Sequence, residues 1–221
     1  MTGGATGKTT RYWDCCKPSC GWNNGGYTPT TCCTQSNSVH TNSWDSQSGC
    51  AGGDVYTCWS NRPWAVNSKL AYGFTAVQAG SSQFGCGECI QLEFTSGTVE
   101  GKTMIVQVTN IGGDVSSNQF DLMIPGGGVG LFDGCSKQWG VSSSELGSTY
   151  GGFYDWCLKN ENTLMAALEC TIDKCNSVFA NKPDLKDGCM WFIKWFRGAN
   201  NPAVKWQKVN CPQELKAISG M

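Results

Sequence analysis

Residues 89–95, CIQLEFT, set the pattern for much of the chain. Ile90, Leu92 and Phe94 alternate with polar side chains, which is the period-two spacing of a β-strand with one buried face. Twenty-nine glycines, scattered between short apolar stretches, indicate tight turns that join short strands. Four further strands are predicted from similar alternation or from aromatic and branched side chains, at residues 104–108, 120–124, 190–196 and 204–209. The sequence therefore predicts a mostly β fold.

Residues 161–175 depart from this pattern. Four apolar side chains there have helical spacing and would share one face of an amphipathic helix: Leu164, Ala167, Leu168 and Ile172. We expect this helix to pack rather than to carry function. The sequence has no internal repeat, no charge run and no linker rich in Pro, Ser or Thr, so we expect residues 1–221 to form one unit.

Composition excludes several classes of partner. Sixteen basic and seventeen acidic residues give a formal net charge of −1, which is unlike the basic surface that neutralises nucleic-acid phosphates. No apolar run approaches the ~20 residues that cross a bilayer. We therefore expect neither a nucleic-acid partner nor a membrane anchor.

The fifteen cysteines indicate an oxidising compartment, and so a secreted protein. Cys86 and Cys89 form a C-x-x-C, but no second pair has a matching spacing and His40 is the only histidine, which argues against zinc. No metal or cofactor is expected. Residues 1–8 (MTGGATGK) lack the apolar core of a signal peptide, so we expect the sequence to be a processed form.

Two stretches carry candidate catalytic carboxylates. In residues 9–22, TTRYWDCCKPSCGW, aromatic side chains precede Asp14 and two cysteines follow it. If both cysteines are bonded, Asp14 is held rigidly without a regular element around it, as a catalytic group requires.

The second stretch, residues 112–135, reads GGDVSSNQFDLMIPGGGVGLFDGC. It places Asp114 on a glycine-flanked loop and Asp121 at the start of a predicted strand, followed by a triple glycine whose backbone can approach a flat ligand closely. A phosphate-binding loop is excluded because Gly-Lys-Ser/Thr does not follow Gly128.

These features suggest sugar chemistry. Glycosidic hydrolysis needs a proton donor and a second carboxylate, and the ten tryptophans offer flat apolar surfaces against which sugar rings can lie.

Both stretches resemble the two signature blocks of glycoside hydrolase family 45, and PWAVN at residues 63–67, FTSG at 94–97 and Cys211-Pro212 extend the resemblance over nearly the whole chain. The resemblance implies a six-stranded double-psi β-barrel with long disulfide-stapled loops and a few short helices. It also implies a single catalytic domain over residues 1–221, with neither a linker nor a carbohydrate-binding module.

The resemblance further implies an endo-β-1,4-glucanase that hydrolyses cellulose and cello-oligosaccharides with inversion, as a secreted monomer. By motif, Asp14 is the general base, Asp121 the general acid and Asp114 an assisting residue. The implied substrate contacts are Thr10, Tyr12, Lys17, Trp22, Gln119, Gly127, Gly128, Phe132 and Tyr150.

Gln119 departs from the family, which commonly has histidine at this position. Glutamine can hydrogen-bond but cannot titrate. We therefore expect activity to remain, with an altered acidic limb of the pH profile.

The disulfides that the resemblance implies are Cys15–Cys135, Cys16–Cys50, Cys20–Cys86, Cys33–Cys58 and Cys89–Cys211. One family bridge is missing, since Gly87 stands in place of a cysteine and Met221 lies where its partner would be. Four cysteines remain for two bridges of open connectivity: Cys157, Cys170, Cys175 and Cys189. Either Cys32 or Cys33 is then unpaired.

Plainer roles remain open for several residues. Asp14 could cap a turn, Asp121 could be a buried strand residue, Asp114 could lie in an ordinary turn and Trp22 could be packed. His40 is expected at the surface. Five other tryptophans are expected in the core or scaffold: Trp139, Trp156, Trp191, Trp195 and Trp206.

The alternative function is a non-hydrolytic, expansin-like cell-wall-loosening or carbohydrate-binding protein on the same barrel. Such proteins resemble the family around the acid but lack the base, so Asp14 favours the enzyme.

Overall fold

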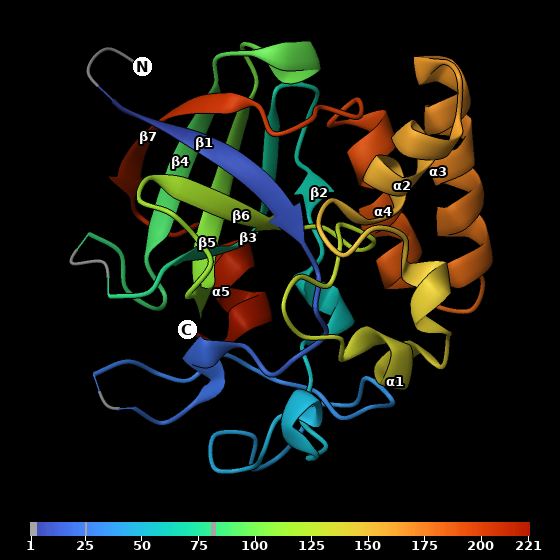
Figure 1. Cartoon of the computed structure of the whole chain (residues 1–221). Coiled ribbons are helices and arrows are strands. Elements are labelled where there is room, and N and C mark those ends of the chain that lie inside the picture. Colours follow the sequence, from blue (N-terminus) through green and yellow to red (C-terminus); the bar gives the residue numbers. More distant parts are fainter. Residues whose placement is uncertain (1–3, 25, 81–82) are drawn as a thin grey trace.

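In the computed structural model, which describes residues 4–24, 26–80 and 83–221, six strands close into a barrel and a seventh, β2, pairs with β3 outside the ring. Figure 1 shows the barrel beside a group of helices. The strands are β1 (Ala5–Tyr12), β2 (Trp64–Ala65), β3 (Leu70–Gln78), β4 (Cys89–Phe94), β5 (Thr103–Gly112), β6 (Gln119–Met123) and β7 (Ala203–Val209).

Two parallel strand pairs define the barrel. β1 runs parallel to β6 and β3 runs parallel to β5, while β4 and β7 join these pairs through antiparallel contacts. The ring closes where β3 meets β6, with Ala76 opposite Asp121. The mostly β fold and the double-psi barrel are thereby confirmed.

The alternation in residues 89–95 works as expected. Ile90, Leu92 and Phe94 are buried in the barrel core, whereas Gln91 and Glu93 are only partly buried. The predicted strands at 104–108, 120–124 and 204–209 fall within β5, largely within β6 and within β7.

Helices α2 to α4 lie together on one side of the barrel (Figure 1). The α-helices are α1 (Cys135–Trp139), α2 (Gly152–Asn160), α3 (Leu164–Val178), α4 (Pro183–Lys194) and α5 (Gln213–Ser219). Short 3-10 turns lie at Ser19–Gly21, Gly49–Ala51, Trp59–Asn61, Gly97–Val99 and Ser143–Leu146.

The prediction of a strand at residues 190–196 is wrong, because this stretch ends α4. The Trp191 and Trp195 rings stack with centroids 5.3 Å apart, a contact between positions four apart that an extended strand cannot make. Phe196 meets Phe94 of the barrel at 5.3 Å, while α4 also packs against α3. Within residues 190–196 only Lys194 is exposed, so this short aromatic stretch has the composition of a buried strand, which explains the error.

The helix predicted at 161–175 begins and ends three residues later, as α3. The side chain of Thr163 caps it by accepting a hydrogen bond from the Ala166 amide at 3.1 Å. Its buried face differs from the expected one, since Leu164 is 61% exposed. The face toward the protein is formed by Ala167, Thr171, Cys175 and Val178.

Two side chains differ from expectation in their degree of burial. His40 is only partly exposed: 14% of its side chain is accessible, and Nε2 lies 3.4 Å from Oδ1 of the exposed Asp54. Trp156 is not in the core but is exposed at the surface of α2, where the Lys174 ammonium lies 4.2 Å from its ring centroid.

All fifteen cysteines lie among the described residues, and fourteen of them form seven disulfides. Five are the pairs that the family resemblance implies. The other two, Cys157–Cys170 and Cys175–Cys189, tie α2 to α3 and α3 to α4. Cys32 is the free thiol and is buried. A Cβ on Gly87 would lie 3.2 Å from Met221 Cε, so the two positions of the missing family bridge are adjacent.

Among the residues that the structure describes, no helix combines the length and apolar character needed to cross a membrane.

Candidate active site

A cleft of about 600 Å³ crosses the end of β1 and gathers residues from distant parts of the chain. Its walls come from β1 and the loop that follows it, the loop between β5 and β6, and the loops around residues 128–132, 149–151 and 200–201. Eleven of the twelve predicted catalytic and substrate-binding residues line it: Thr10, Tyr12, Asp14, Lys17, Trp22, Asp114, Gln119, Asp121, Gly128, Phe132 and Tyr150.

Gly127 is the residue that lies elsewhere. It is buried, and a Cβ there would come within 3.0 Å of the Tyr12 backbone nitrogen. The absence of a side chain therefore allows the glycine-rich loop to pack against the end of β1, which places the neighbouring Gly128 at the cleft.

Asp14 follows β1 and directly precedes two cysteines that are bonded to different parts of the chain. Cys15 is bonded to Cys135 and Cys16 to Cys50, and Cys15 holds a positive φ of 65°, which is uncommon for a non-glycine residue. The Cys16 amide donates to Asp14 Oδ1 at 3.0 Å. Burial, chiefly, and then the charge of Asp121 raise the pKa of Asp14 to about 7.

Asp121 lies on β6, where the parallel register places it opposite Thr10 of β1. The Thr10 hydroxyl donates to Asp121 Oδ1 at 2.6 Å. Burial raises the pKa of Asp121 to about 7; the Thr10 hydrogen bond opposes this rise, the charge of Asp114 adds to it and the charge of Arg11 opposes it.

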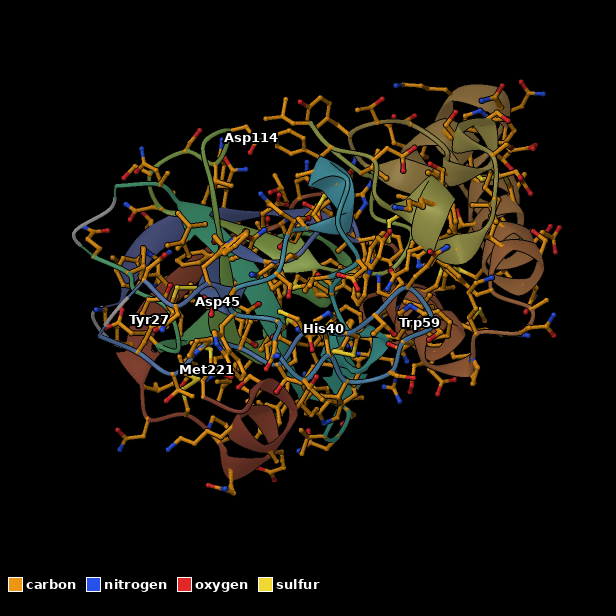
Figure 2. The ribbon with its side chains drawn as sticks, turned by 90° about the horizontal axis from the view of Figure 1, so that it is seen from below. Tyr27, His40, Asp45, Trp59, Asp114 and Met221 are labelled. Atoms are coloured by element: carbon orange, nitrogen blue, oxygen red, sulfur yellow. A yellow bond between two sulfur atoms is a disulfide. The ribbon has the colours of Figure 1, made fainter. Side chains whose placement is uncertain are left out.

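Asp114 is exposed on the loop between β5 and β6, and Figure 2 shows it at the outer edge of the molecule. Its carboxylate still affects the site through charge, because it contributes to the raised pKa of both Asp14 and Asp121.

Tyr12 lines the cleft near enough to Asp14 and Asp121 to interact with both through charge. Its hydroxyl accepts a hydrogen bond from Asn110 Nδ2 at 3.0 Å, and Asn110 Oδ1 accepts from the Ser19 hydroxyl at 2.9 Å. Burial, reinforced by the charge of Asp14, raises the pKa of Tyr12 well above its ordinary value. Tyr12 therefore stays a neutral phenol at the cleft.

Lys17 and Trp22 form one unit in the wall of the cleft. The Lys17 ammonium lies 3.1 Å from the Trp22 ring centroid and donates to the Ser46 carbonyl at 2.9 Å. Lys17 is itself only 5% exposed. Its observed partners are thus the indole and the backbone. The free thiol of Cys32 lies next to this unit, since a Cβ on Gly21 would meet both the Cys32 sulfur and the Lys17 side chain.

Exposed apolar side chains continue the cleft on its other side. Phe132 and Tyr150 are 59% and 61% exposed, and Leu131, which sequence reasoning missed, is exposed beside them. Such surfaces suit the C–H faces of sugar rings.

Arg11 is another cleft residue that sequence reasoning missed. Its guanidinium donates to Asn200 Oδ1 at 2.9 Å and to the Gly151 carbonyl at 3.2 Å, so it ties together two loops of the cleft wall. Burial lowers the pKa of Arg11 to about 10. The sequence offered one indication of this role, because Arg11 is a charged side chain between two predicted substrate contacts, Thr10 and Tyr12.

Across residues 4–24, 26–80 and 83–221, no group of three or more His, Cys, Asp or Glu side chains is arranged to hold a metal ion.

The model of glycosyl hydrolase family 45 matches residues 6–221. Endoglucanase B of Cellvibrio japonicus is 45% identical over 240 residues, which cover 100% of this chain and 46% of that protein. The putative endoglucanase type K of Fusarium oxysporum is 42% identical over 221 residues, which cover 97% of this chain and 53% of that protein.

The chain thus spans about half the length of these two curated relatives. In three dimensions it is similar to the crystal structure of the cellulase from the Antarctic springtail Cryptopygus antarcticus, with a TM-score of 0.82 and 38% identity over 98% of this chain and 96% of that one. The chain therefore belongs to glycosyl hydrolase family 45.

Proposed function

We propose that the chain is an endo-β-1,4-glucanase that cuts cellulose-type chains with inversion, using Asp121 as general acid and Asp14 as general base. The observation that carries this proposal is that two carboxyl groups from separate elements line one cleft and both have a pKa raised to about 7. The names of the relatives, two endoglucanases and a cellulase, support the choice of substrate class.

The proposed reaction is a single displacement. Asp121 gives its proton to the glycosidic oxygen as the bond from that oxygen to the anomeric carbon breaks, and the bonding electrons stay with the leaving oxygen. A water molecule attacks the anomeric carbon from the opposite face and loses a proton to Asp14. Solvent returns Asp121 to its acid form and removes the proton from Asp14.

The other cleft residues would hold the glucan chain. Trp22, Phe132 and Tyr150 offer flat surfaces for successive sugars. Asp114, on its exposed loop, would close over the substrate and assist the acid, since its negative charge favours the protonated form of Asp121.

We further propose that residues 1–221 act as a single catalytic domain that is secreted, monomeric and free of cofactors. The seven disulfides support an oxidising compartment. Light scattering coupled to gel filtration is expected to give the mass of one chain, and a mass of two chains would contradict the monomer.

The deciding experiment is a reducing-sugar assay on carboxymethyl cellulose with the wild type and Asp14→Asn. We expect the variant to lose at least ~100-fold in kcat, because an amide cannot accept the proton of water. Asp173→Asn, on the exposed surface of α3, is the matched control and should keep wild-type activity.

Proton NMR of the first product separates inversion from retention, since an inverting enzyme releases the α-anomer from a β-linked chain. If wild type releases no sugar yet binds cellulose, the expansin-like alternative is favoured. If Asp14→Asn stays fully active, Asp14 is not the base.

A further inference from the structure

A chain of three hydrogen bonds ends on the proposed acid. The Ser116 amide donates to Gln119 Oε1 at 3.2 Å, Gln119 Nε2 donates to Thr10 Oγ1 at 2.9 Å, and Thr10 Oγ1 donates to Asp121 Oδ1 at 2.6 Å. The parallel register of β1 and β6 makes this possible, because Thr10 stands opposite Asp121 and Gln119 precedes Asp121 by two residues on the same face of the strand.

The direction of this chain is fixed by the kinds of group in it. A backbone amide can only donate, so Ser116 must face the oxygen of the Gln119 side chain, which leaves its nitrogen facing Thr10. An amide nitrogen also only donates, so the Thr10 oxygen must accept from it. The single hydroxyl proton of Thr10 is then directed to Asp121.

The direction of these hydrogen bonds makes the two oxygens of the Asp121 carboxyl group different. Oδ1 is engaged as an acceptor whether or not Asp121 carries a proton, while Oδ2 accepts no hydrogen bond from the residues that the structure describes. We propose that Gln119 and Thr10 are positioning residues that confine the acid's proton to Oδ2 of Asp121 by fixing the direction of this hydrogen-bond chain. This inference rests on the proposed function, in which Asp121 is the acid.

The charged and titratable groups around Asp121 do not make this choice between oxygens. Arg11 from β1, Asp114 from the loop between β5 and β6, and Asp14 and Tyr12 from the end of β1 and beyond all interact with it through charge. They change how readily the carboxyl group ionises. The Thr10 hydroxyl, by direct contact, decides which oxygen holds the proton.

The proton transfer is the one already proposed, with its atoms specified. The proton leaves Oδ2 for the glycosidic oxygen, and Asp121 becomes a carboxylate whose Oδ1 still accepts from Thr10. A charge-assisted bond strengthens as that charge appears, so the same hydroxyl also stabilises the carboxylate that the reaction produces.

Thr10→Val tests the proposal, because valine keeps the shape of threonine and removes the hydroxyl. Two substrates are compared: cellotetraose, whose leaving sugar needs a proton, and 2,4-dinitrophenyl β-cellotrioside, whose leaving group does not. We expect kcat to fall ~10–100-fold on cellotetraose and less than ~3-fold on the nitrophenyl substrate, as for the loss of a well-placed general acid. Thr10→Ser retains the hydroxyl and should restore most of the difference.

Gln119 provides a second, independent pair of variants. Gln119→Glu replaces the donor with a group that accepts, so the Thr10 proton is contested by two carboxylates and kcat on cellotetraose should fall selectively. The added negative charge alone would raise the pKa of Asp121, so a charge effect is recognised separately, by a shift of the alkaline limb of the pH profile to higher pH. Gln119→Met, which neither donates nor accepts strongly, should have a smaller effect.

Equal losses on both substrates in Thr10→Val would overturn the proposal, because they would indicate a role in folding or binding. The proposal would also be overturned if Thr10→Val and Gln119→Glu both hydrolysed cellotetraose at the wild-type rate. If Thr10→Val does not fold by circular dichroism, the Gln119 pair decides. Asp121→Asn tests the proposed function separately from the role of Thr10. If that variant still hydrolyses cellotetraose, Asp121 is not the acid, whatever the result for Thr10→Val.

Discussion

Asp14 and Asp121 share a cleft and have the same raised pKa, yet the proposed reaction needs one ionised and the other protonated. Each pKa of about 7 has burial as its largest cause. Because the two groups interact, they titrate as a coupled pair, and the productive state is a minority even at its maximum.

The pH dependence of kcat/KM follows from these values. Activity should fall at acidic pH as Asp14 takes up a proton, fall at alkaline pH as Asp121 loses one, and peak near neutrality. Asp114→Asn should move both limbs to lower pH by less than about one unit, since the charge of Asp114 raises both values. Initial rates on cellotetraose from pH 4 to 10 measure this; a rate that stays flat from pH 4 to 7 would contradict it.

Gln119→His introduces a titrating group one hydroxyl away from the acid. Below its ordinary pKa of about 6.5, the imidazolium would favour the ionised form of Asp121 and so remove the acid. We expect kcat to fall on the acidic limb only, relative to wild type. An unchanged profile of kcat against pH would show that this position does not influence proton transfer.

Among helices and strands, sequence patterns succeeded where a short stretch shows the whole period. In β4 the alternation of Ile90, Leu92 and Phe94 with polar side chains is complete within six residues. Residues 190–196 hold only one exposed side chain, Lys194, so their aromatic residues favoured a strand. The helical period of α4 is visible only over its full length, where Pro183 and Asp187 share the exposed face with Lys194.

In the loop after β1, the Lys17 ammonium lies against the Trp22 ring. Lys17→Met removes the ammonium from the Trp22 ring and should raise KM by about 2–5-fold with little change in kcat, from a cation–π energy of ~0.5–1 kcal/mol. If Lys17 acts only by holding the indole, the effects of Lys17→Met and Trp22→Ala on KM will not add in the double variant. Additive effects would instead indicate that Lys17 contacts the sugar directly.

At the scale of the whole molecule, the cleft is assembled from segments that approach one another only in the folded chain. The two carboxylates lay in recognisable motifs, but Arg11, Asn200 and the Gly151 carbonyl meet across some 190 residues of sequence. No local pattern encodes such a meeting. The same holds for cysteine connectivity in 157–189: four cysteines allow three pairings, and only the packing of α2, α3 and α4 selects one.

The free thiol of Cys32 affects how the protein is inactivated by heat. Burial raises its pKa to about 11, so in the native state it is a protonated sulfur that cannot start an exchange reaction. Thermal opening would return it toward an ordinary thiol, directly beside the Cys33–Cys58 bond. Heating would then allow the Cys32 thiolate to exchange with this disulfide and rearrange it irreversibly, faster in alkaline solution, so exposure of this one sulfur gives the protein a route to irreversible inactivation.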